Sequence, residues 1–489
     1  MFDSIVEAVF HHAGRQPDKL CLADDFRSVT YREYAETICR YANLFEKLGI
    51  SREGYVVVEA CQTIDYLAIQ MALQLNGAIF VPLEHNCAHD RIQALATRME
   101  AEMIVACRDR GFDAPLFYTH DQLGRMAGAE PASFSAGFPT GAEISEILFS
   151  TGTTGREKGI VLTHANEVAL AGNVIEGVQM ERDNVEMIPS PMNHSHGLRR
   201  YYANMYNGSS VVLLGSVLNM KLFLENMDKY RVNSLDLVPS ALSVILQLSR
   251  DRLAGYRGQI RYIQFGAAPM LEADRLRICE LLPDARLYNF YGSTESGCSC
   301  LYNFNRPDSK KNCIGRPACN AEIFIVDENR REIASSASNT GLLASRGPMN
   351  MLHYWRDPAE TEKVLCDGVL YTNDVAYIDE DGDVILLGRK GDVINVGGNK
   401  VSPEEIEDVA KHIPGVADCG VIPVDDPGKG SVPKLFVQMA QGVPFDPVAI
   451  RNRLSEGLEP YKVPVYIVQI QAVPRSFNGK LLRKELKKQ

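Results

Sequence analysis

Short apolar, β-rich runs alternate with helical stretches from Ser4 to about Leu301, and this alternation limits the possible folds. The first such unit has a strand candidate at Tyr55 to Glu59, followed by the amphipathic stretch Ile64 to Leu75. The other strand candidates are Ala78 to Pro82, Met103 to Ala106, Ile144 to Phe149, Ser210 to Leu214, Ser234 to Val238, Arg261 to Phe265 and Leu287 to Tyr291. The pattern predicts a layered α/β fold with largely parallel sheets, whose ligands bind at the carboxyl ends of the strands.

The texture changes after Ile314, where short strands separated by Asp-Gly turns predict a small antiparallel, β-barrel-like unit. One of these turns, Asp379 to Asp383, resembles a calcium loop, but the ligand alternation and terminal Glu are missing, so we expect a hairpin turn. The last 100 residues or so predict a small α+β domain with a helix that starts at Pro403, behind Ser402 as N-cap. We therefore expect two domains, 1–389 and 390–489.

Composition excludes several partners. The chain has 489 residues, which is more than a single core of roughly 250–300 residues usually holds. Its formal charge of −11 argues against nucleic acid or an anionic membrane as the main partner. With no long apolar run and no basic leader, a soluble, cytoplasmic protein is expected. The 12 cysteines form no CxxC pairs, so we expect buried reduced thiols instead of zinc ligands; His194-Ser195-His196 lacks an evident third metal ligand.

A loop rich in hydroxyls and glycines follows the apolar run Ile144 to Phe149. Its sequence is Ser150-Thr151-Gly152-Thr153-Thr154-Gly155-Arg156-Glu157-Lys158-Gly159. Backbone N–H groups, hydroxyls and the mobile charge of Lys158 suit the binding of phosphate. The glycine spacing is not that of a P-loop, and an ordinary surface loop is the alternative for this run taken alone.

Further motifs at strand ends and turns fit nucleotide chemistry. Gly266-Ala267-Ala268-Pro269 lets a flat base approach the backbone. Tyr291-Gly292-Ser293-Thr294-Glu295 offers an aromatic face, hydroxyls and a carboxylate for base stacking and a Mg²⁺-bridged phosphate. Asp374 could accept both ribose hydroxyls, with the donors of Arg389 nearby, and Lys480 lies on a glycine turn close to the C-terminus. Each could be a plain turn, but their joint order is harder to dismiss.

In order and spacing these motifs resemble the adenylate-forming superfamily of acyl-CoA synthetases, amino-acid adenylation domains and luciferases. The resemblance covers nearly the whole chain. It implies a mobile C-terminal domain and a two-step reaction, in which a carboxylic acid and ATP form an acyl-AMP with pyrophosphate release and a thiol then displaces AMP. It also implies that Ser150 to Gly159 bind phosphate, that Glu295 binds Mg²⁺, that Asp374 binds ribose, and that Lys480 serves adenylation with Lys158, Thr294 and Arg389.

The same resemblance assigns residues to the C-terminal side of the reaction. It places the hinge at Lys390 and Gly391, where glycine allows the change of φ and ψ. Gly397 and Gly398, with Asn399 and Lys400, would line the path of the thiol of CoA.

The segment Pro191 to Leu198 bears on the acid. It lacks the aspartate with which amino-acid-activating members hold an ammonium, so an α-amino acid is disfavoured. The resemblance places His194 beside the acyl carboxylate, although a packed core histidine is the alternative. The small Gly292 suggests room for an acid longer than acetate, and Arg199 or Arg200 could pair a second carboxylate, unless both serve solvation or structural ion pairs. The predicted acyl pocket is completed by Asn193, Gly197 and Gly266.

Three functions stay open at this stage. The leading one is an acyl-CoA ligase that uses ATP, Mg²⁺ and CoA. The second is a stand-alone adenylating enzyme that loads an acyl or aryl acid onto the phosphopantetheine of a carrier protein. The third is a nucleotide-binding homologue without catalysis, against which the presence of Lys480, Glu295 and Lys158 argues.

Overall fold

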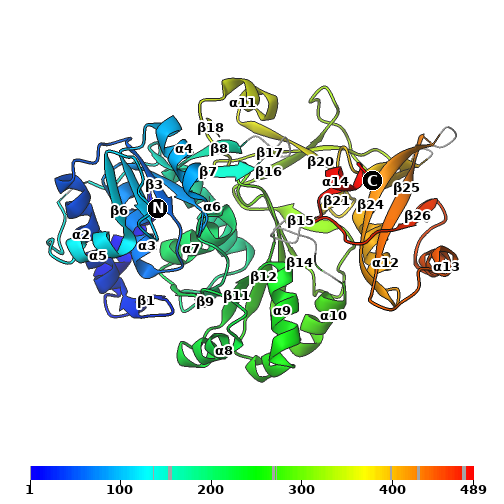
Figure 1. Cartoon of the computed structure of the whole chain (residues 1–489), viewed down its shortest axis with the longest axis horizontal. Coiled ribbons are helices and arrows are strands. Elements are labelled where there is room, and N and C mark those ends of the chain that lie inside the picture. The colour runs from blue at the N-terminus through cyan, green and yellow to red at the C-terminus, as the bar shows by residue number, and fades with distance from the viewer. Residues whose placement is uncertain are drawn as a thin grey trace.

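The computed structural model describes residues 2–135, 137–151, 157–266, 270, 272–396, 399–426, 430–475 and 481–489. Helices cover and separate three sheets, and the chain runs from the N-terminal sheet at one end of the molecule to a small C-terminal sheet at the other (Figure 1). The helices are α1 Ile5–Arg15, α2 Tyr31–Lys47, α3 Ile64–Leu75, α4 His89–Met99, α5 His120–Ala127, α6 His164–Gly177, α7 Ser195–Asn207, α8 Met220–Lys229, α9 Pro239–Ser249, α10 Glu272–Leu281, α11 Pro358–Val364, α12 Pro403–Lys411, α13 Pro447–Gly457 and α14 Arg483–Leu486, with a 3₁₀ turn at Arg252–Tyr256.

The N-terminal sheet has the strand order β18-β8-β7-β4-β3-β5-β6. Strands β4, β3, β5 and β6 are parallel, whereas β7 and β8 form an antiparallel hairpin. The bounds are β3 Tyr55–Glu59, β4 Ile79–Leu83, β5 Met103–Ala106, β6 Leu116–Thr119, β7 Ile144–Thr151, β8 Glu157–Thr163 and β18 His353–Tyr354. The central strands β4 and β5 are apolar and buried along their whole length, because both faces are covered, whereas the edge strand β6 is only partly buried.

A second, larger sheet has the order β16-β17-β20-β21-β15-β14-β13-β12-β11-β9-β10-β1-β2, with β19 on β20. Its parallel half contains β1 Leu20–Ala23, β9 Val185–Ile188, β10 Ser210–Leu213, β11 Ser234–Leu237, β12 Tyr262–Phe265 and β13 Arg286–Tyr291, and β2 Ser28–Thr30 pairs antiparallel at its edge. Its antiparallel half contains β14 Cys300–Asn303, β15 Cys313–Pro317, β16 Glu322–Val326, β17 Gly341–Arg346, β19 Leu365–Cys366, β20 Val369–Ile378 and β21 Val384–Arg389. The antiparallel strands that the sequence predicts therefore continue the parallel sheet through β14 and β15.

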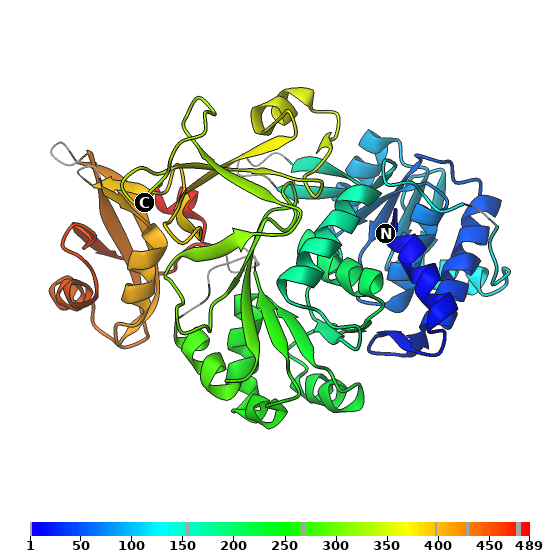
Figure 2. The ribbon, with the colours of Figure 1, turned by 180° about the vertical axis from the view of Figure 1, so that it is seen from behind.

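The largest hydrophobic core joins the two N-terminal sheets. It combines α1, α2, α3, α6 and α7 with strands of both sheets, and Figure 2 shows α6 and α7 between them from behind. Helix α6 directly follows β8 and begins with a capping box, in which the Thr163 hydroxyl accepts the Asn166 N–H and the Asn166 side chain accepts the Thr163 N–H. This cap fixes the direction in which the chain leaves the β7–β8 hairpin, which contains the predicted phosphate loop.

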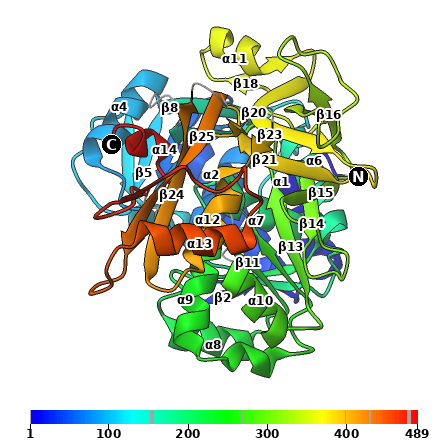
Figure 3. The same cartoon turned by 90° about the vertical axis from the view of Figure 1, so that its right-hand side faces the viewer.

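The C-terminal unit has its own sheet and core. Strands β22 Ile394–Val396, β23 Asn399–Val401, β24 Val416–Asp426, β25 Gly430–Met439 and β26 Tyr466–Gln469 form the sheet, and α12 and α13 pack on it (Figure 3). Pro403 is the first residue of α12, as expected, but the Ser402 hydroxyl donates to Glu404 and caps no backbone N–H. The domain boundary at residue 389 stays a prediction, although β21 ends there.

The turn at Asp379 to Asp383 is a hairpin turn between β20 and β21, as predicted. The Lys310 ammonium lies 2.6 Å from Asp379, 2.7 Å from Asp381 and 2.8 Å from Asp383. A lysine thus satisfies the three carboxylates that resemble a calcium loop. Within the described residues, no helix is long and apolar enough to span a membrane.

Candidate active site

The predicted phosphate loop, Ser150 to Gly159, connects the two strands of the β7–β8 hairpin. Ser150 pairs with Lys158 and Phe149 with Gly159, where an added Cβ would lie 2.9 Å from the Phe149 ring, so the close pairing requires glycine. Gly152, Thr153, Thr154, Gly155 and Arg156 lie outside the described residues, as does the side chain of Thr151. The structure therefore places the base of the predicted cradle but does not describe its tip.

Lys158 is held by residues from distant parts of the chain. Its Nζ lies 2.6 Å from Glu360 Oε2 on α11 and 4.8 Å from the centre of the Tyr354 ring. Strand β18 brings both groups in, because Tyr354 pairs with Ile160 of β8. Hydrogen bonds from Lys158 and Lys363 lower the pKa of Glu360 to about 2. Sequence reasoning missed Tyr354 and Glu360, since no local pattern links them to the loop.

Glu295 and Thr294 follow β13, at the carboxyl end of the parallel strands. The Tyr354 hydroxyl donates to Glu295 Oε1 over 2.9 Å, and Ser195 Oγ lies 3.1 Å from Thr294 Oγ1. One carboxylate with a hydroxyl beside it suits Mg²⁺, which takes one or two carboxylates and completes its shell with water and substrate phosphates. Glu295 Oε2 is the oxygen that would bind the ion. Ser293 Oγ instead accepts the Ser296 N–H and belongs to the turn.

Asp374 lies at a junction between β13, β20 and β21. Its Oδ1 lies 2.8 Å from Arg389 Nε, and its Oδ2 accepts the hydroxyl of Tyr291. Asp374 and Arg389 are direct cross-strand partners. Asp374 is 8% exposed, and its carboxylate already accepts from the Tyr291 hydroxyl and from Arg389 Nε, so the donors left for an incoming ligand are the other guanidinium N–H groups of Arg389. The structure therefore brings together three residues that the sequence assigns to nucleotide binding.

Gly266 follows β12 and is buried against the start of helix α7. A Cβ at Gly266 would lie 3.1 Å from His196 and 3.3 Å from Arg199 Nη2. The residues that follow it in the predicted adenine motif, Ala267, Ala268 and Pro269, lie outside the described part of the chain. The side chains of His196 and Arg199 thus pack directly against the Gly266 backbone, and this close approach favours glycine.

Two other predicted pocket glycines have packing reasons. A Cβ at Gly292 would lie 1.9 Å from the Gly297 carbonyl oxygen, and one at Gly197 would lie 2.6 Å from the Pro191 carbonyl oxygen. Both backbones approach other backbone too closely for a side chain. The size of Gly292 therefore gives no measure of the acid, although its place beside Thr294 puts it at the site.

Helix α7 begins at the acyl segment. His194 is its N-cap residue but makes no side-chain cap, so the first backbone N–H groups of α7 have no partner from that side chain. Asn193 Nδ2 lies 3.4 Å from His194 Nε2. His194 keeps an exposed face, and desolvation by the surrounding protein lowers its pKa, which favours the neutral ring at pH 7. A neutral hydrogen-bonding ring therefore lies at a helix N-terminus, which favours an anion.

The neighbours Arg199 and Arg200 have opposite environments. Arg200 is fully buried and forms a bidentate pair with Glu186 at 2.7 and 2.8 Å, and it also donates to Gln264 and Tyr262. Arg200 is thus a structural ion pair, one of the two roles left open by the sequence.

Arg199 has no carboxylate within ion-pair distance among the described residues. Its Nη2 lies 2.6 Å from His196 Nδ1, its guanidinium lies 3.5 Å from the centre of the Phe290 ring, and its buried Nε has no hydrogen-bond partner there. Burial lowers the pKa of Arg199 to about 10. A cavity of about 20 Å³, large enough for one water molecule, connects Arg199 with Ser195 and Thr294. The buried carboxylate of Asp236, 3.0 Å from His196 Nε2, partly balances the charge of Arg199 from behind the histidine. The Arg199 guanidinium therefore borders the predicted acid site without a carboxylate in direct contact among the described residues.

The predicted hinge forms the turn between β21 and β22. The Lys390 N–H donates to the Asn373 carbonyl over 2.7 Å, and Gly391 has open space where a Cβ would point. Asn399 and Lys400 begin β23 and are exposed, whereas Gly397, Gly398 and Lys480 lie outside the described residues. The roles of all these residues stay predictions.

Comparison with known proteins agrees with this arrangement. The chain is 26% identical over 510 residues to 4-coumarate-CoA ligase 1 of Narcissus pseudonarcissus, which covers 98% of this chain and 92% of that protein. It is 26% identical over 489 residues to 2-succinylbenzoate–CoA ligase of Bacillus cereus, covering 100% and 99%. The crystal structure of ATP-bound MatB from Rhodopseudomonas palustris matches the fold with a TM-score of 0.88 at 23% identity, covering 100% of this chain and 99% of that one.

Two family models match the chain, one in its N-terminal part and one in its C-terminal part. Residues 9–355 match the AMP-binding enzyme family, and residues 405–480 match the AMP-binding enzyme C-terminal domain. The first match alone covers more than half of the chain. The chain therefore belongs to the AMP-binding enzyme family, and the resemblance to the adenylate-forming superfamily and the mixed α/β fold predicted from the sequence are confirmed.

Proposed function

We propose that this protein uses ATP to convert a carboxylic acid to an acyl-adenylate, releases pyrophosphate, and then transfers the acyl group to the thiol of CoA. The observation that carries the proposal is the line of groups from Asp374 through Thr294 to the N-terminus of α7. These groups suit the ribose, the phosphates and the acid of one ligand. The CoA ligases among the relatives support CoA over a carrier protein as the acceptor.

The first step needs a better leaving group than oxide. The acid carboxylate attacks the α-phosphorus of ATP, the bond to the bridging oxygen breaks, and pyrophosphate leaves with the electron pair. Negative charge grows on the phosphate oxygens, so Lys158, Arg389 and Lys480 stabilise the transition state by several kcal/mol in total. Glu295 would hold Mg²⁺, which neutralises phosphate charge when bound.

The second step is attack of the CoA thiolate on the acyl carbonyl carbon, with AMP as the leaving group. The turn at Lys390 and Gly391 would allow the C-terminal unit to reorient between the steps, so that Lys480 serves only the first. Asn399 and Lys400, on exposed backbone at the start of β23, would then face the thiol.

We also propose that the acid carries a second anionic group, which Arg199 binds. The support is the contrast between the two arginines, since Arg200 is used by Glu186 while Arg199 has a stacking ring and a histidine but no carboxylate. A buried cation without a carboxylate in direct contact is unfavourable, and a substrate carboxylate that reached Arg199 would relieve that cost. The acid would have to open the water-sized cavity.

The test is a pyrophosphate-release assay with ATP, Mg²⁺ and a panel of matched mono- and dicarboxylic acids, followed by detection of the CoA thioester. We expect acid-dependent release, a thioester with CoA, and a preference for dicarboxylic acids that Arg199→Met abolishes. Lys221→Met, on an exposed helix face, is the matched control. If none of the acids in the panel stimulates pyrophosphate release, the ligase proposal is contradicted. A preference unchanged in Arg199→Met would contradict only the second carboxylate.

A further inference from the structure

Cysteine and histidine side chains gather at the carboxyl edge of the N-terminal sheet, and none of them belongs to the proposed active site. The parallel strands β4, β3, β5 and β6 are neighbours in the sheet, and each is followed almost at once by one such residue. These residues are His85 after β4, Cys61 after β3, Cys107 after β5 and His120 at the start of α5, which follows β6. The parallel arrangement brings together residues that are far apart in the sequence.

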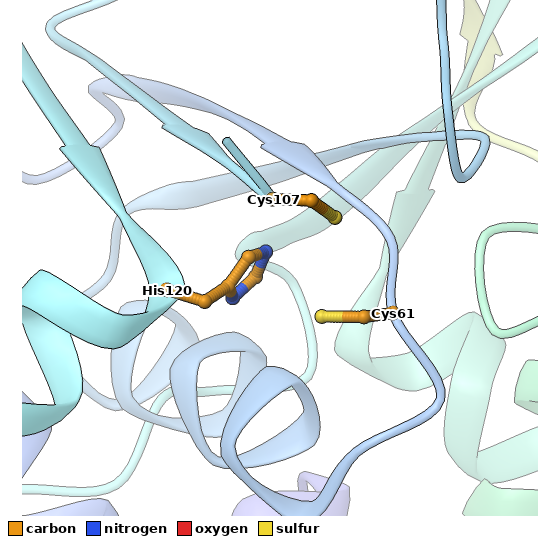
Figure 4. Close-up of side chains that lie close together, drawn as sticks. All are labelled: Cys61, Cys107 and His120. Atoms are coloured by element: carbon orange, nitrogen blue, oxygen red, sulfur yellow. The ribbon is translucent and has the colours of Figure 1, made fainter. Parts of the chain in front are cut away.

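Three of these side chains converge on one point. The Sγ atoms of Cys61 and Cys107 and a ring nitrogen of His120 lie within 4.8 Å of one another. Figure 4 shows the three side chains directed toward one another from separate segments. Bonds of about 2.3 Å to sulfur and 2.0 Å to nitrogen at tetrahedral angles put ligand atoms roughly 3.5–3.8 Å apart. Small side-chain rotations therefore suffice to enclose an ion.

His120 is arranged as a metal-binding histidine. Its Nε2 lies 2.8 Å from the Glu59 carbonyl oxygen, which can only accept, so Nε2 carries the proton. Its Nδ1 is buried and has no hydrogen-bond partner among the described residues, so it holds an unused lone pair. A metal-bound histidine in proteins almost always donates its other N–H to a carbonyl or carboxylate in this way. A buried lone pair without a partner, on a ring beside two thiols, therefore points to a cation.

His85 is the nearest further ligand. Its Nδ1 lies 3.6 Å from Cys107 Sγ and 3.1 Å from the Ala60 carbonyl oxygen. His85 lies outside the group of ligand atoms that are within 4.8 Å of one another, so its ring would have to turn to complete a set of two sulfur and two nitrogen ligands. A water molecule is the other occupant of the fourth position.

We propose that Cys61, Cys107 and His120 bind Zn²⁺, with His85 as the fourth ligand. Two thiolates with imidazole nitrogen form a donor set that suits this ion. We expected reduced thiols without a metal site because the sequence has no closely spaced pairs of ligands. Such spacing cannot reveal ligands that follow four separate strands.

The ion would act on structure. Gln62, beside Cys61, donates to the carbonyl oxygens of Ile188 and Ser190 over 3.1 and 3.0 Å, and Tyr66 OH donates to the Met192 carbonyl over 3.0 Å. The segment that precedes α7 therefore rests on the loop that carries Cys61. Zinc would fix this loop and raise thermal stability.

The test uses the full-length protein, purified under reducing conditions and stripped of metal. Zn²⁺ affinity is measured by competition with a chromophoric chelator, and Co²⁺ serves as a spectroscopic probe of thiolate ligation. We expect one equivalent of Zn²⁺, a cobalt–thiolate charge-transfer band, and an upward shift of the melting temperature with Zn²⁺. Cys61→Ser, Cys107→Ser and His120→Gln should each weaken binding at least tenfold and abolish or shift the band.

Two sets of variants make the result specific. Cys39→Ser and Cys366→Ser, a buried and an exposed cysteine elsewhere, should bind Zn²⁺ like the wild type. His85→Ala should weaken binding if His85 is the fourth ligand; wild-type affinity in this variant would overturn that part and leave water in its place. Circular dichroism of each variant without metal checks folding.

The proposal is overturned if the wild-type protein binds Zn²⁺ no better than the Cys61→Ser/Cys107→Ser double variant. It is also overturned if Cys61 and Cys107 form a disulfide in the isolated protein and the reduced form binds no metal. Neither result would touch the ligase proposal, whose readout is pyrophosphate and thioester.

Discussion

Replacement of Arg200 by methionine should destabilise the fold far more than the same change at Arg199. Arg200 is fully buried and donates to Glu186, Gln264 and Tyr262. Its removal leaves the Glu186 carboxylate, which is also fully buried, with Asn204 as its close remaining donor. Breaking such a pair usually costs about 3–5 kcal/mol, because one charge stays buried without compensation.

Two further results are expected for the Arg200→Met variant. In the Glu186→Gln/Arg200→Met double variant no charge is stranded, so we expect it to recover about 2 kcal/mol relative to Arg200→Met. Burial already raises the pKa of Glu186, so the stranded carboxyl should take up a proton in the folded state. A folded-state pKa above the unfolded value adds stability as the pH falls, and the deficit of Arg200→Met should shrink from pH 8 to pH 5.

The assay is urea denaturation followed by the fluorescence of Trp355, the single tryptophan, which contacts the N-terminal sheet. Arg199→Met, at the preceding position of α7, is the matched control. It leaves no carboxylate without its direct partner, so its free energy of unfolding should fall by less than about 1–2 kcal/mol. Equal destabilisation by both substitutions, or no recovery in the double variant, would refute the assignment of the structural role to Arg200.

Three other predictions address the site and the C-terminal unit. Asp374→Asn should raise the KM for ATP by about 10–100-fold, because it removes the charge that holds Arg389 and Tyr291; Asp367→Asn in an exposed turn is the control, and an unchanged KM would contradict the assignment. Tyr354→Phe should slow acid-dependent pyrophosphate release about tenfold through loss of the bond to Glu295, while the ring beside Lys158 remains; a rate equal to wild type would count against that contact. Burial raises the pKa of Glu407 to about 7, so the folded state holds this proton above the unfolded pKa, and the free energy of unfolding should fall by at most about 3 kcal/mol as pH rises from about 4.5 to 7. In Glu407→Gln, the free energy of unfolding measured by urea denaturation should fall less with rising pH than in the wild type. The same pH dependence in both proteins would disprove the raised pKa of Glu407.

The sequence predicts elements whose cause is local. The strands at Tyr55 to Glu59 and Met103 to Ala106 are found where their apolar runs lie, because buried parallel strands need apolar side chains on both faces. The turn at Asp379 to Asp383 and the helix start at Pro403 follow from residue-specific backbone preferences.

Contacts between distant segments could not be predicted in the same way. The pairing of Tyr354 with Ile160 places a ring beside Lys158, yet nothing near Tyr354 indicates that partner. The two arginines of α7 look alike in sequence, and only the fold shows which one meets Glu186. Cys61 and His120 belong to a common cluster because of strand order, which spacing along the chain does not encode.

Because Lys158 already contacts Glu360, the proposed binding of phosphate by this lysine would exchange one anionic partner for another. The glutamate carboxylate already supplies the lysine with a negative partner 2.6 Å away, so a triphosphate gains only the difference between its own attraction and that of the carboxylate. The same carboxylate can take the lysine back when pyrophosphate departs. Glu360 would thereby weaken the grip on the substrate and ease the loss of the product, which shifts the benefit of Lys158 toward the moment when charge on the leaving group is greatest.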